Sequence, residues 1–405
     1  MSKQVKIFVL TLSVAIVLFT IVGGLRVKAA SDDGAYRQLG VFSEVLSRIR
    51  TEYVEEPNIP EVTDGALHGL LESLDANSSY LSPTEYKEYK AHKADGKGTI
   101  GASVSKRFGY AAVISTIPGG PADKAGIESG DIFEAVESKS TREMSLAEID
   151  GALDGQVGSN VTVSVVRARR VEPLKVTITR DQVKMPPVTD KMMDNGIAYI
   201  KVETFTKGKA QELANKVKAE QNAGAKKLII DLRDNSEGEE AEGIAAANLF
   251  LDHGTITYLQ GQKYPRENFT ADPQKKITDL PMVVLVNKGT AGPAEILAGA
   301  LLENNRADIV GDKTFGVGSI QKVIDVPDGS ALILSVAKYY TPNGKAIQDT
   351  AITPNIIVAD NSNDFLLPDE DENNPAEPEK KQRTPQNDDQ LQRAIQVLQA
   401  GSKKA

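Results

Sequence analysis

Two glycine-rich segments, residues 287–296 and 314–321, bring hydroxyl and amine side chains to close spacing in the sequence. A hydroxyl can attack a peptide carbonyl when a neutral amine takes its proton and backbone N–H groups stabilise the oxyanion. The first segment follows an apolar strand and precedes a predicted helix, and a helix N-terminus offers free N–H groups and a positive dipole end. The hydroxyls considered as nucleophiles are Thr290 and Ser319, and the nearest amines, in or beside these segments, are Lys288, Lys313 and Lys322.

Both segments resemble the active-site segments of the carboxyl-terminal processing peptidases, serine proteases with a Ser-Lys dyad. They read Asn-Lys-Gly-Thr-Ala-Gly-Pro-Ala-Glu-Ile and Thr-Phe-Gly-Val-Gly-Ser-Ile-Gln. The family has its nucleophilic serine where this chain has Gly292, and its lysine base where this chain has Val317. Gln321, which orients the lysine in the family, is kept. The resemblance therefore implies a protease scaffold without its hydroxyl and its amine.

The resemblance also places two changes in the expected oxyanion hole. The amide after the nucleophile is a donor in the family, and this chain has Pro293 there, which has no N–H. Proline in the first turn of a helix has a structural explanation as well. The second donor region reads Leu-Arg-Asp-Asn-Ser-Glu-Gly and keeps Gly238, whereas Glu237 replaces a glycine and is expected to bring a carboxylate near the oxyanion. Losing one donor costs about 10²–10³ in rate, and losing nucleophile and base about 10⁶.

Residues 97–182 resemble a PDZ domain. The stretch Gly-Thr-Ile-Gly-Ala-Ser-Val at 98–104 is similar to the loop and strand that bind a peptide carboxylate, and 121–131 fits Pro-Ala-x-x-Ala-Gly-Ile-x-x-Gly-Asp. Glycines let successive amides turn toward an anion, and the next strand offers an open edge for strand addition. The alternative is that its apolar residues form a core alone. The residues expected to bind the peptide are Thr99, Ile100, Gly101, Ala102 and Val104 on the loop and strand, with Leu146, Ile149 and Leu153 on the following helix.

The rest of the chain predicts a multidomain α+β and α/β fold. Residues 35–92 show helical spacing of apolar residues, and 74–81 are similar to a family segment in which Ala76 and Asn77 replace Pro and His. Residues 190–360 alternate predicted strands and helices, which indicates an α/β peptidase-like core with a mostly parallel sheet. The strand at 281–287 is apolar throughout, so both of its faces should be buried.

The two ends of the chain differ from this pattern. Residues 1–30 contain an uncharged apolar run after Lys3 and Lys6, so we expect a signal peptide or an N-terminal membrane anchor. Residues 361–388 are acidic and rich in proline, which is typical of a disordered linker, and 389–400 predict an amphipathic helix. The leader predicts an exported protein, located in the bacterial periplasm or cell envelope or anchored to the inner membrane.

Composition excludes several functions. The net charge is −9 with no basic stripe, so a nucleic acid partner is not expected. There is no cysteine, which excludes disulfides and thiolate metal sites. Three histidines, His68, His92 and His253, are scattered, and we expect no cofactor or metal.

Three hypotheses follow. The preferred one is an exported pseudoprotease that binds protein or peptide C-termini through its PDZ domain, beside an active paralogous protease. The second is an active serine-type endopeptidase that cleaves near protein C-termini with relocated catalytic residues. The third is a structural envelope protein whose PDZ-like region mediates self-association. A homo-oligomer is compatible with all three.

Overall fold

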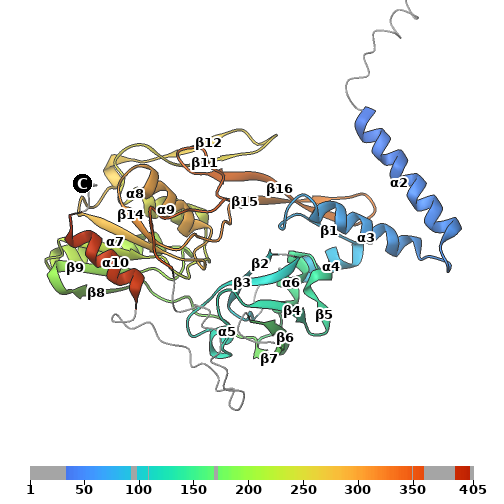
Figure 1. The fold of residues 1–405 in the computed structure, drawn as a ribbon, viewed down its shortest axis with the longest axis horizontal. Helices are drawn as coiled ribbons and strands as arrows, with labels where there is room; N and C mark the ends of the chain where they lie inside the picture. Colours follow the sequence, from blue (N-terminus) through green and yellow to red (C-terminus); the bar gives the residue numbers. More distant parts are fainter. Residues whose placement is uncertain are drawn as a thin grey trace, which may run out of the picture. The chain divides into compact units, whose positions relative to one another are not determined.

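The computed structural model describes residues 33–92, 98–107, 109–167, 172–348, 350–359 and 388–401 (Figure 1). The predicted leader at 1–30 and the predicted linker residues 361–387 lie outside these ranges. Among the described residues, no helix combines the length and apolar character needed to cross a bilayer. The chain divides into two compact units, Met1–Ala66 and Leu67–Ala405.

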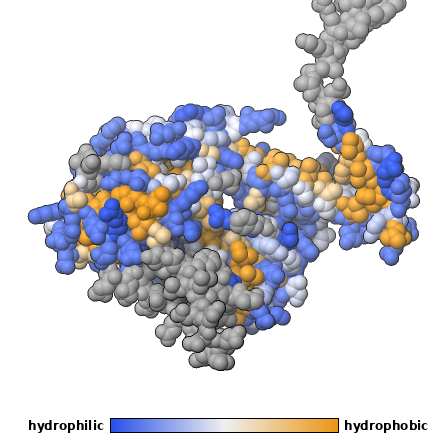
Figure 2. Space-filling view, in the orientation of Figure 1, coloured by the Kyte–Doolittle hydropathy of each residue, from blue (hydrophilic) through white to orange (hydrophobic). Residues whose placement is uncertain are grey.

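The first unit contains helix α2 (Asp33–Glu52) and the start of α3 (Ile59–Glu72). Arg48 pairs with Glu44 and Glu52, each one turn away on the same helix. Apolar residues spaced three and four apart share one face of a helix, as predicted. Figure 2 shows apolar surface in this region, and the exposed apolar residues of α2 include Leu39, Val41, Phe42 and Val45.

In the second unit, the PDZ-like domain has a six-stranded antiparallel sheet in the order β2-β3-β4-β6-β7, with β5 beside β4. Ser145 caps helix α6: its hydroxyl accepts from the Glu148 amide at 3.2 Å, and the Glu148 carboxylate accepts from the Ser145 amide at 2.8 Å. This capping box fixes which residues of α6 face the sheet. The elements are β2 (Ala102–Arg107), β3 (Tyr110–Thr116), α5 (Pro121–Lys124), β4 (Ile132–Val136), β5 (Lys139–Ser140), η1 (Thr141–Glu143), α6 (Leu146–Leu153), β6 (Asn160–Val166) and β7 (Leu174–Thr179).

The core domain has a six-stranded sheet in the order β17-β14-β13-β10-β9-β8, in which only the β8–β9 pair is antiparallel. The predicted mostly parallel sheet is confirmed. Its strands are β8 (Thr189–Met193), β9 (Ile197–Lys201), β10 (Lys227–Asp231), β13 (Met282–Val286), β14 (Asp308–Gly311) and β17 (Ile356–Ile357).

Helices cover both faces of this sheet, because successive side chains of a strand point to opposite sides. Leu228 and Ile230 pack in one apolar cluster with residues of three helices, α7 (Lys209–Asn222), α8 (Glu240–Asn248) and α9 (Pro293–Glu303). Ile229, between them, packs in a second cluster with Leu391 of α10 (Asp389–Gln399). All five residues of β13 are buried, as predicted for a strand covered on both sides.

A separate antiparallel sheet was only partly predicted. Its order is β1-β16-β11-β12, with β15 beside β16. The sequence predicted a strand at 331–337 within β16 but not the long hairpin that β15 and β16 form. This hairpin starts at Ser319, within the second glycine-rich segment. The remaining elements are α4 (Pro83–His92), β1 (Ser79–Leu81), β11 (Thr255–Gln260), β12 (Glu267–Thr270), β15 (Ser319–Asp325) and β16 (Ala331–Tyr340).

Candidate functional site

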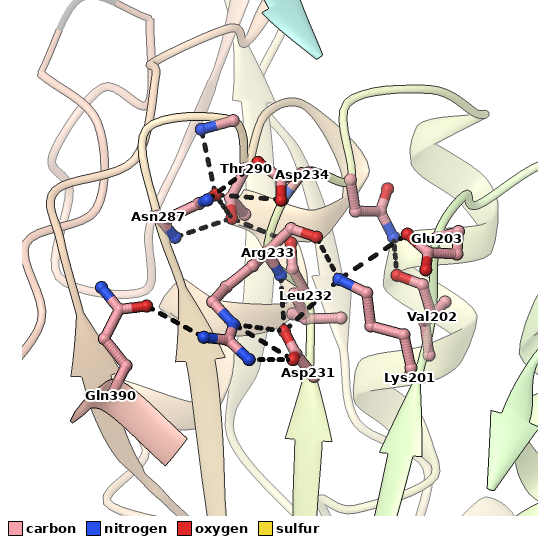
Figure 3. Close-up of polar contacts among 12 residues, drawn as sticks. Lys201, Val202, Glu203, Asp231, Leu232, Arg233, Asp234, Asn287, Thr290 and Gln390 are labelled. Carbon is pink, nitrogen blue, oxygen red and sulfur yellow. Dashed lines mark hydrogen bonds and ion pairs between the residues drawn. The ribbon is translucent and has the colours of Figure 1, made fainter. Parts of the chain in front are cut away.

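The turn between β13 and α9 is tied to the loop after β10 (Figure 3). The Asn287 side chain accepts from the Asp234 amide at 3.0 Å and donates to the Asp234 carboxylate at 2.8 Å. The Thr290 hydroxyl donates to the Leu232 carbonyl at 2.8 Å. Because both loops leave the carboxyl ends of neighbouring parallel strands, these bonds place the two expected active-site loops side by side.

Gly292, at the nucleophile position, precedes α9 with φ 59° and ψ −121°. A positive φ favours glycine over other residues. A Cβ atom at this position would meet no other atom within 4 Å. There is therefore open space where the family's serine has its side chain. Pro293 is the first residue of α9, where its missing N–H has no intrahelical partner to lose.

Glu295 joins the two glycine-rich segments. One carboxylate oxygen accepts from the amides of Gly292 at 3.0 Å and Val317 at 2.8 Å, and the other accepts from the Gly316 amide at 2.9 Å and the Thr314 hydroxyl. The side chain is fully buried, and burial raises the pKa of Glu295 to about 7 against the opposing effect of these four donors. One carboxylate thus holds the nucleophile and base positions next to each other.

Gln321, the kept family residue, bonds within the β15–β16 hairpin. Its amide nitrogen donates to the Ser319 hydroxyl at 2.8 Å, and the same hydroxyl accepts from the Asn77 amide at 3.1 Å. Asn77 occupies the position of the family's histidine, so two family positions converge on Ser319. Val317 is only partly buried and has no group that could accept a proton.

The relocated groups do not form a preorganised dyad. Thr290 is fully buried, and its hydroxyl also accepts from the Asn287 amide at 3.0 Å. Lys288 is 76% exposed and lies 3.4 Å from Asp312, and Lys313 and Lys322 are exposed. A lysine base needs a desolvated amine, and exposure keeps these amines in water.

Glu237 does not lie as expected: its side chain lines a cavity together with Ser103 on β2 of the PDZ domain. Burial is the main cause of its raised pKa. The backbone explains this direction: Phe205 donates to the Glu237 carbonyl at 2.7 Å, and Glu239 donates to the Phe205 carbonyl at 3.0 Å. Gly238 between them has φ 139°, and a Cβ there would lie 2.2 Å from the Phe205 carbonyl carbon. Only glycine fits this position, and its neighbour points into the PDZ groove.

The predicted peptide-binding residues divide into groove and core. A cavity of about 300 Å³ between β2 and α6 is lined by Thr99, Ala102, Ser103, Val104, Asp150, Leu153, Asp154 and Glu237. Leu146 lines an adjoining cavity of about 440 Å³.

Two predicted lining residues belong to the domain's core instead. The side chains of Ile100 and Ile149 are 1% and 0% exposed. The helical period explains the error on α6: residues four apart share a face, so Leu146, Asp150 and Asp154 look into the groove and Ile149 looks inward. Gly101 has φ 71°, and its carbonyl accepts from the Ile117 amide at 2.8 Å, which sets the bend of the loop.

A buried ion cluster lies at the carboxyl end of β10 (Figure 3) and was not predicted. The Arg233 guanidinium bonds to Asp231 at 2.6 Å and to Asp388, just before α10, at 2.8 Å. Tyr199 donates to Asp231 at 2.6 Å, and the Lys201 amine lies 3.5 Å from the same carboxylate. Burial, the largest single effect, raises the pKa of Asp231, but Arg233, Lys201 and Tyr199 together outweigh it and hold the pKa well below its usual range. Within the part of the chain that the structure describes, no three His, Asp or Glu side chains are grouped so that they could hold a metal ion.

Comparison with known proteins agrees with this arrangement. The model of peptidase family S41 matches residues 196–358, and a PDZ domain model matches residues 113–167. The carboxy-terminal-processing protease of Bartonella bacilliformis is 32% identical over 336 residues, which cover 81% of this chain and 76% of that protein. The carboxy-terminal processing protease CtpA of Bacillus subtilis is 32% identical over 367 residues, which cover 88% of this chain and 78% of that protein.

A solved structure gives the same result for the fold. The photosystem II D1 C-terminal processing protease superimposes with a TM-score of 0.66 and 26% identity, over 78% of this chain and 92% of that chain. Both a PDZ domain and a peptidase core are therefore present in this chain. This chain belongs to the carboxyl-terminal processing proteases of peptidase family S41.

Proposed function

We propose that this family member is an exported pseudoprotease that captures protein C-termini in its PDZ groove without cleaving them. The single observation that carries the proposal is the pair of residues that Glu295 brings together. Gly292 offers no nucleophile and Val317 no base, although the loops around them are held in place.

Pro293 adds an independent defect, because the amide that would follow the nucleophile has no hydrogen to donate. The loss of one oxyanion donor typically lowers the rate by about 10²–10³. The loss of both nucleophile and base lowers it by about 10⁶. Glu237 is not part of this reasoning, since its carboxylate is directed into the PDZ groove.

The alternative is an active serine endopeptidase that uses Thr290 or Ser319. Thr290 donates to a backbone carbonyl and is sealed from solvent, which argues against attack on a substrate. Ser319 is the better candidate, because it is only partly buried and bonds to the amides of Asn77 and Gln321. Neither amide can act as a general base, since both donate to the hydroxyl.

The test combines a cleavage assay and a binding assay on the purified full-length chain. In the first, an unstructured protein such as casein is incubated with this chain and, in parallel, with an active relative of the family. We expect cleavage by the relative alone. Turnover by this chain that disappears in Ser319→Ala would establish the alternative.

The binding assay uses fluorescent peptides with a free or an amidated C-terminus. A PDZ groove recognises the terminal carboxylate through backbone N–H groups, so the free peptides should bind at least about tenfold more tightly. Equal affinity for the two forms would contradict capture of C-termini and would support a structural role for the domain.

A further inference from the structure

The groove between β2 and α6 is lined with carboxylates. Asp150 and Asp154 lie one turn apart along α6 and its C-terminal cap, and both line the cavity of about 300 Å³. Glu237 enters the same cavity from the loop after β10. The residues that line it include no lysine, arginine or histidine.

This acidic groove continues into the second cavity. Asp150 and Asp154 also line the cavity of about 440 Å³, whose other walls come from α4, β1 and the β15–β16 hairpin. Its lining includes Asn77 and Gln321, the two residues that bond to Ser319, and again no basic side chain. A chain bound along α6 would therefore meet the same two carboxylates from either cavity.

The negative charge of the groove is not compensated within the described residues, where no basic side chain pairs with Asp150 or Asp154. Asp150 is exposed at the surface of α6, yet the protein atoms packed around its carboxylate, followed by the charges of Asp154 and Glu237, raise its pKa to about 7. Carboxylates that face one another across a groove with low-dielectric walls repel each other and favour a cation between them.

The orientation of a bound peptide follows from the end of α6. The Gly98 amide donates to the Gly155 carbonyl at 2.7 Å, and the Gly155 amide donates to the Gly98 carbonyl at 3.0 Å. The C-terminal end of α6 thus lies beside the loop that should bind the terminal carboxylate. A peptide that adds to β2 runs along α6, and only alternate side chains of an added strand face the helix.

We propose that this groove selects protein C-termini that carry a lysine or arginine among their last few residues, with the cation placed against Asp150 and Asp154. The inference rests on the proposed capture of C-termini and states which C-termini are captured. The backbone amides of the loop would bind the terminal carboxylate, and the helix acids would bind the basic side chain, so the two charges of the ligand are separated along the groove.

The test measures fluorescence anisotropy with hexapeptides that have a free C-terminus and identical composition apart from one residue. Lysine, alanine or glutamate is placed at the last, second-last or third-last position. At a position that faces α6, we expect lysine to bind about five- to tenfold more tightly than alanine, and glutamate more weakly. Moving the lysine by one residue should abolish the gain, and about 0.5 M salt should reduce it.

Variants of the full-length chain identify the carboxylates. Asp150→Asn and Asp154→Asn keep the shape of the side chains, and together they should remove the preference for lysine, so that the lysine and alanine peptides bind the double variant with similar affinity. Glu143→Gln, on η1, is the matched control, because Glu143 is exposed and lines neither cavity. Circular dichroism verifies that the variants are folded. The effect of salt on the lysine preference of the unmodified chain tests the same charge interaction without any substitution.

The outcomes separate this inference from the proposed function. If all free C-terminal peptides bind with the same affinity whatever their charge, capture of C-termini stands and selection by charge is overturned. If no free C-terminal peptide binds, the proposed function itself fails. If Glu143→Gln changes the preference as much as the groove variants do, the effect is one of overall charge and the site assignment is wrong.

Discussion

The two terminal nitrogens of Arg233 donate to the two carboxylate oxygens of Asp388, each at 2.8 Å. Asp388 directly precedes α10, more than a hundred residues along the chain from Arg233. Both side chains are buried, at 3% and 7% exposure, and Asp231 bonds to the same guanidinium. A charge-assisted, two-point contact of this kind fixes both the position and the angle of the helix that follows.

Replacing Asp388 should loosen α10 from the sheet. Asp388→Ala leaves the buried guanidinium with one carboxylate partner, and breaking a buried ion pair from one side costs about 3 kcal/mol. Urea unfolding followed by circular dichroism measures this loss. Gln399→Ala, an exposed residue at the end of the same helix, is the control and should leave the midpoint unchanged. An unchanged midpoint in Asp388→Ala would show that apolar packing alone holds the helix.

Glu295→Gln should destabilise the core domain, because each oxygen of the Glu295 carboxylate accepts two hydrogen bonds. An amide group in its place turns one of these acceptors into a donor that faces other donors. Leaving buried polar groups unpaired costs about 1–3 kcal/mol each, so we expect a loss of at least about 2 kcal/mol in urea unfolding. Glu240→Gln, on α8, supplies the comparison with the same chemical change. Equal stability of the two variants would contradict the central role given to Glu295.

Binding of a basic peptide should depend on pH through Asp150. Its pKa of about 7 means that the carboxyl group is neutral in weakly acidic solution and ionised in weakly basic solution. The lysine of the peptide keeps its charge throughout this range. Affinity for the lysine peptide should therefore rise as pH increases through about 7, and anisotropy titrations across that range will measure it.

Two comparisons isolate the source of this dependence. The alanine peptide should show little change, and Asp150→Asn should flatten the curve for the lysine peptide. The raised pKa of Glu237 acts in the same direction, so some dependence on pH should persist in the variant. A curve that falls with rising pH would refute the role given to Asp150.

Restoring peptidase chemistry should require three changes. Gly292→Ser is sterically possible, since a Cβ meets no atom within 4 Å, although a positive φ costs a serine roughly 1 kcal/mol. Gly292→Ser with Val317→Lys supplies the nucleophile and the base, and adding Pro293→Ala returns the missing N–H. We expect the triple variant to cleave casein about 10²–10³ times faster than the double variant.

The matched control for this reconstruction is Gly292→Ala with Pro293→Ala and Val317→Lys, which has the same backbone changes but no hydroxyl. It should be as inactive as the unmodified chain. Full activity of the double variant would mean that the proline is a minor defect and that other N–H groups stabilise the oxyanion.

The sequence predicted the overall architecture because its signals are local. Continuous apolar runs indicated buried parallel strands, and β13 is buried along its whole length. The β15–β16 hairpin was missed, because β15 is partly exposed and lacks a clear alternation of apolar and polar residues. For the 98–104 loop the sequence predicted glycines that let the backbone turn, and Gly101 has a φ of 71°.

The directions of side chains and the pairing of residues far apart in the chain were harder to predict from the sequence. Ile149 was assigned to the groove because it is apolar, whereas Asp150, the residue that faces the groove, was overlooked because it is charged. The helical period counted from Leu146 would have found it. Glu237 was placed correctly in its loop but on the wrong side, because the contact between Gly238 and Phe205 that sets its direction cannot be read from either segment alone. The pair of Arg233 and Asp388 joins parts of the chain with no shared pattern.

The position of Glu295 has a consequence for the design of variants. Its carboxylate holds the two loops mainly through their backbone amides, so the side chains at positions 292 and 317 can be exchanged without removing these hydrogen bonds. Point substitutions at the two loop tips should therefore change the chemistry of the site while the hydrogen bonds to the Glu295 carboxylate stay in place.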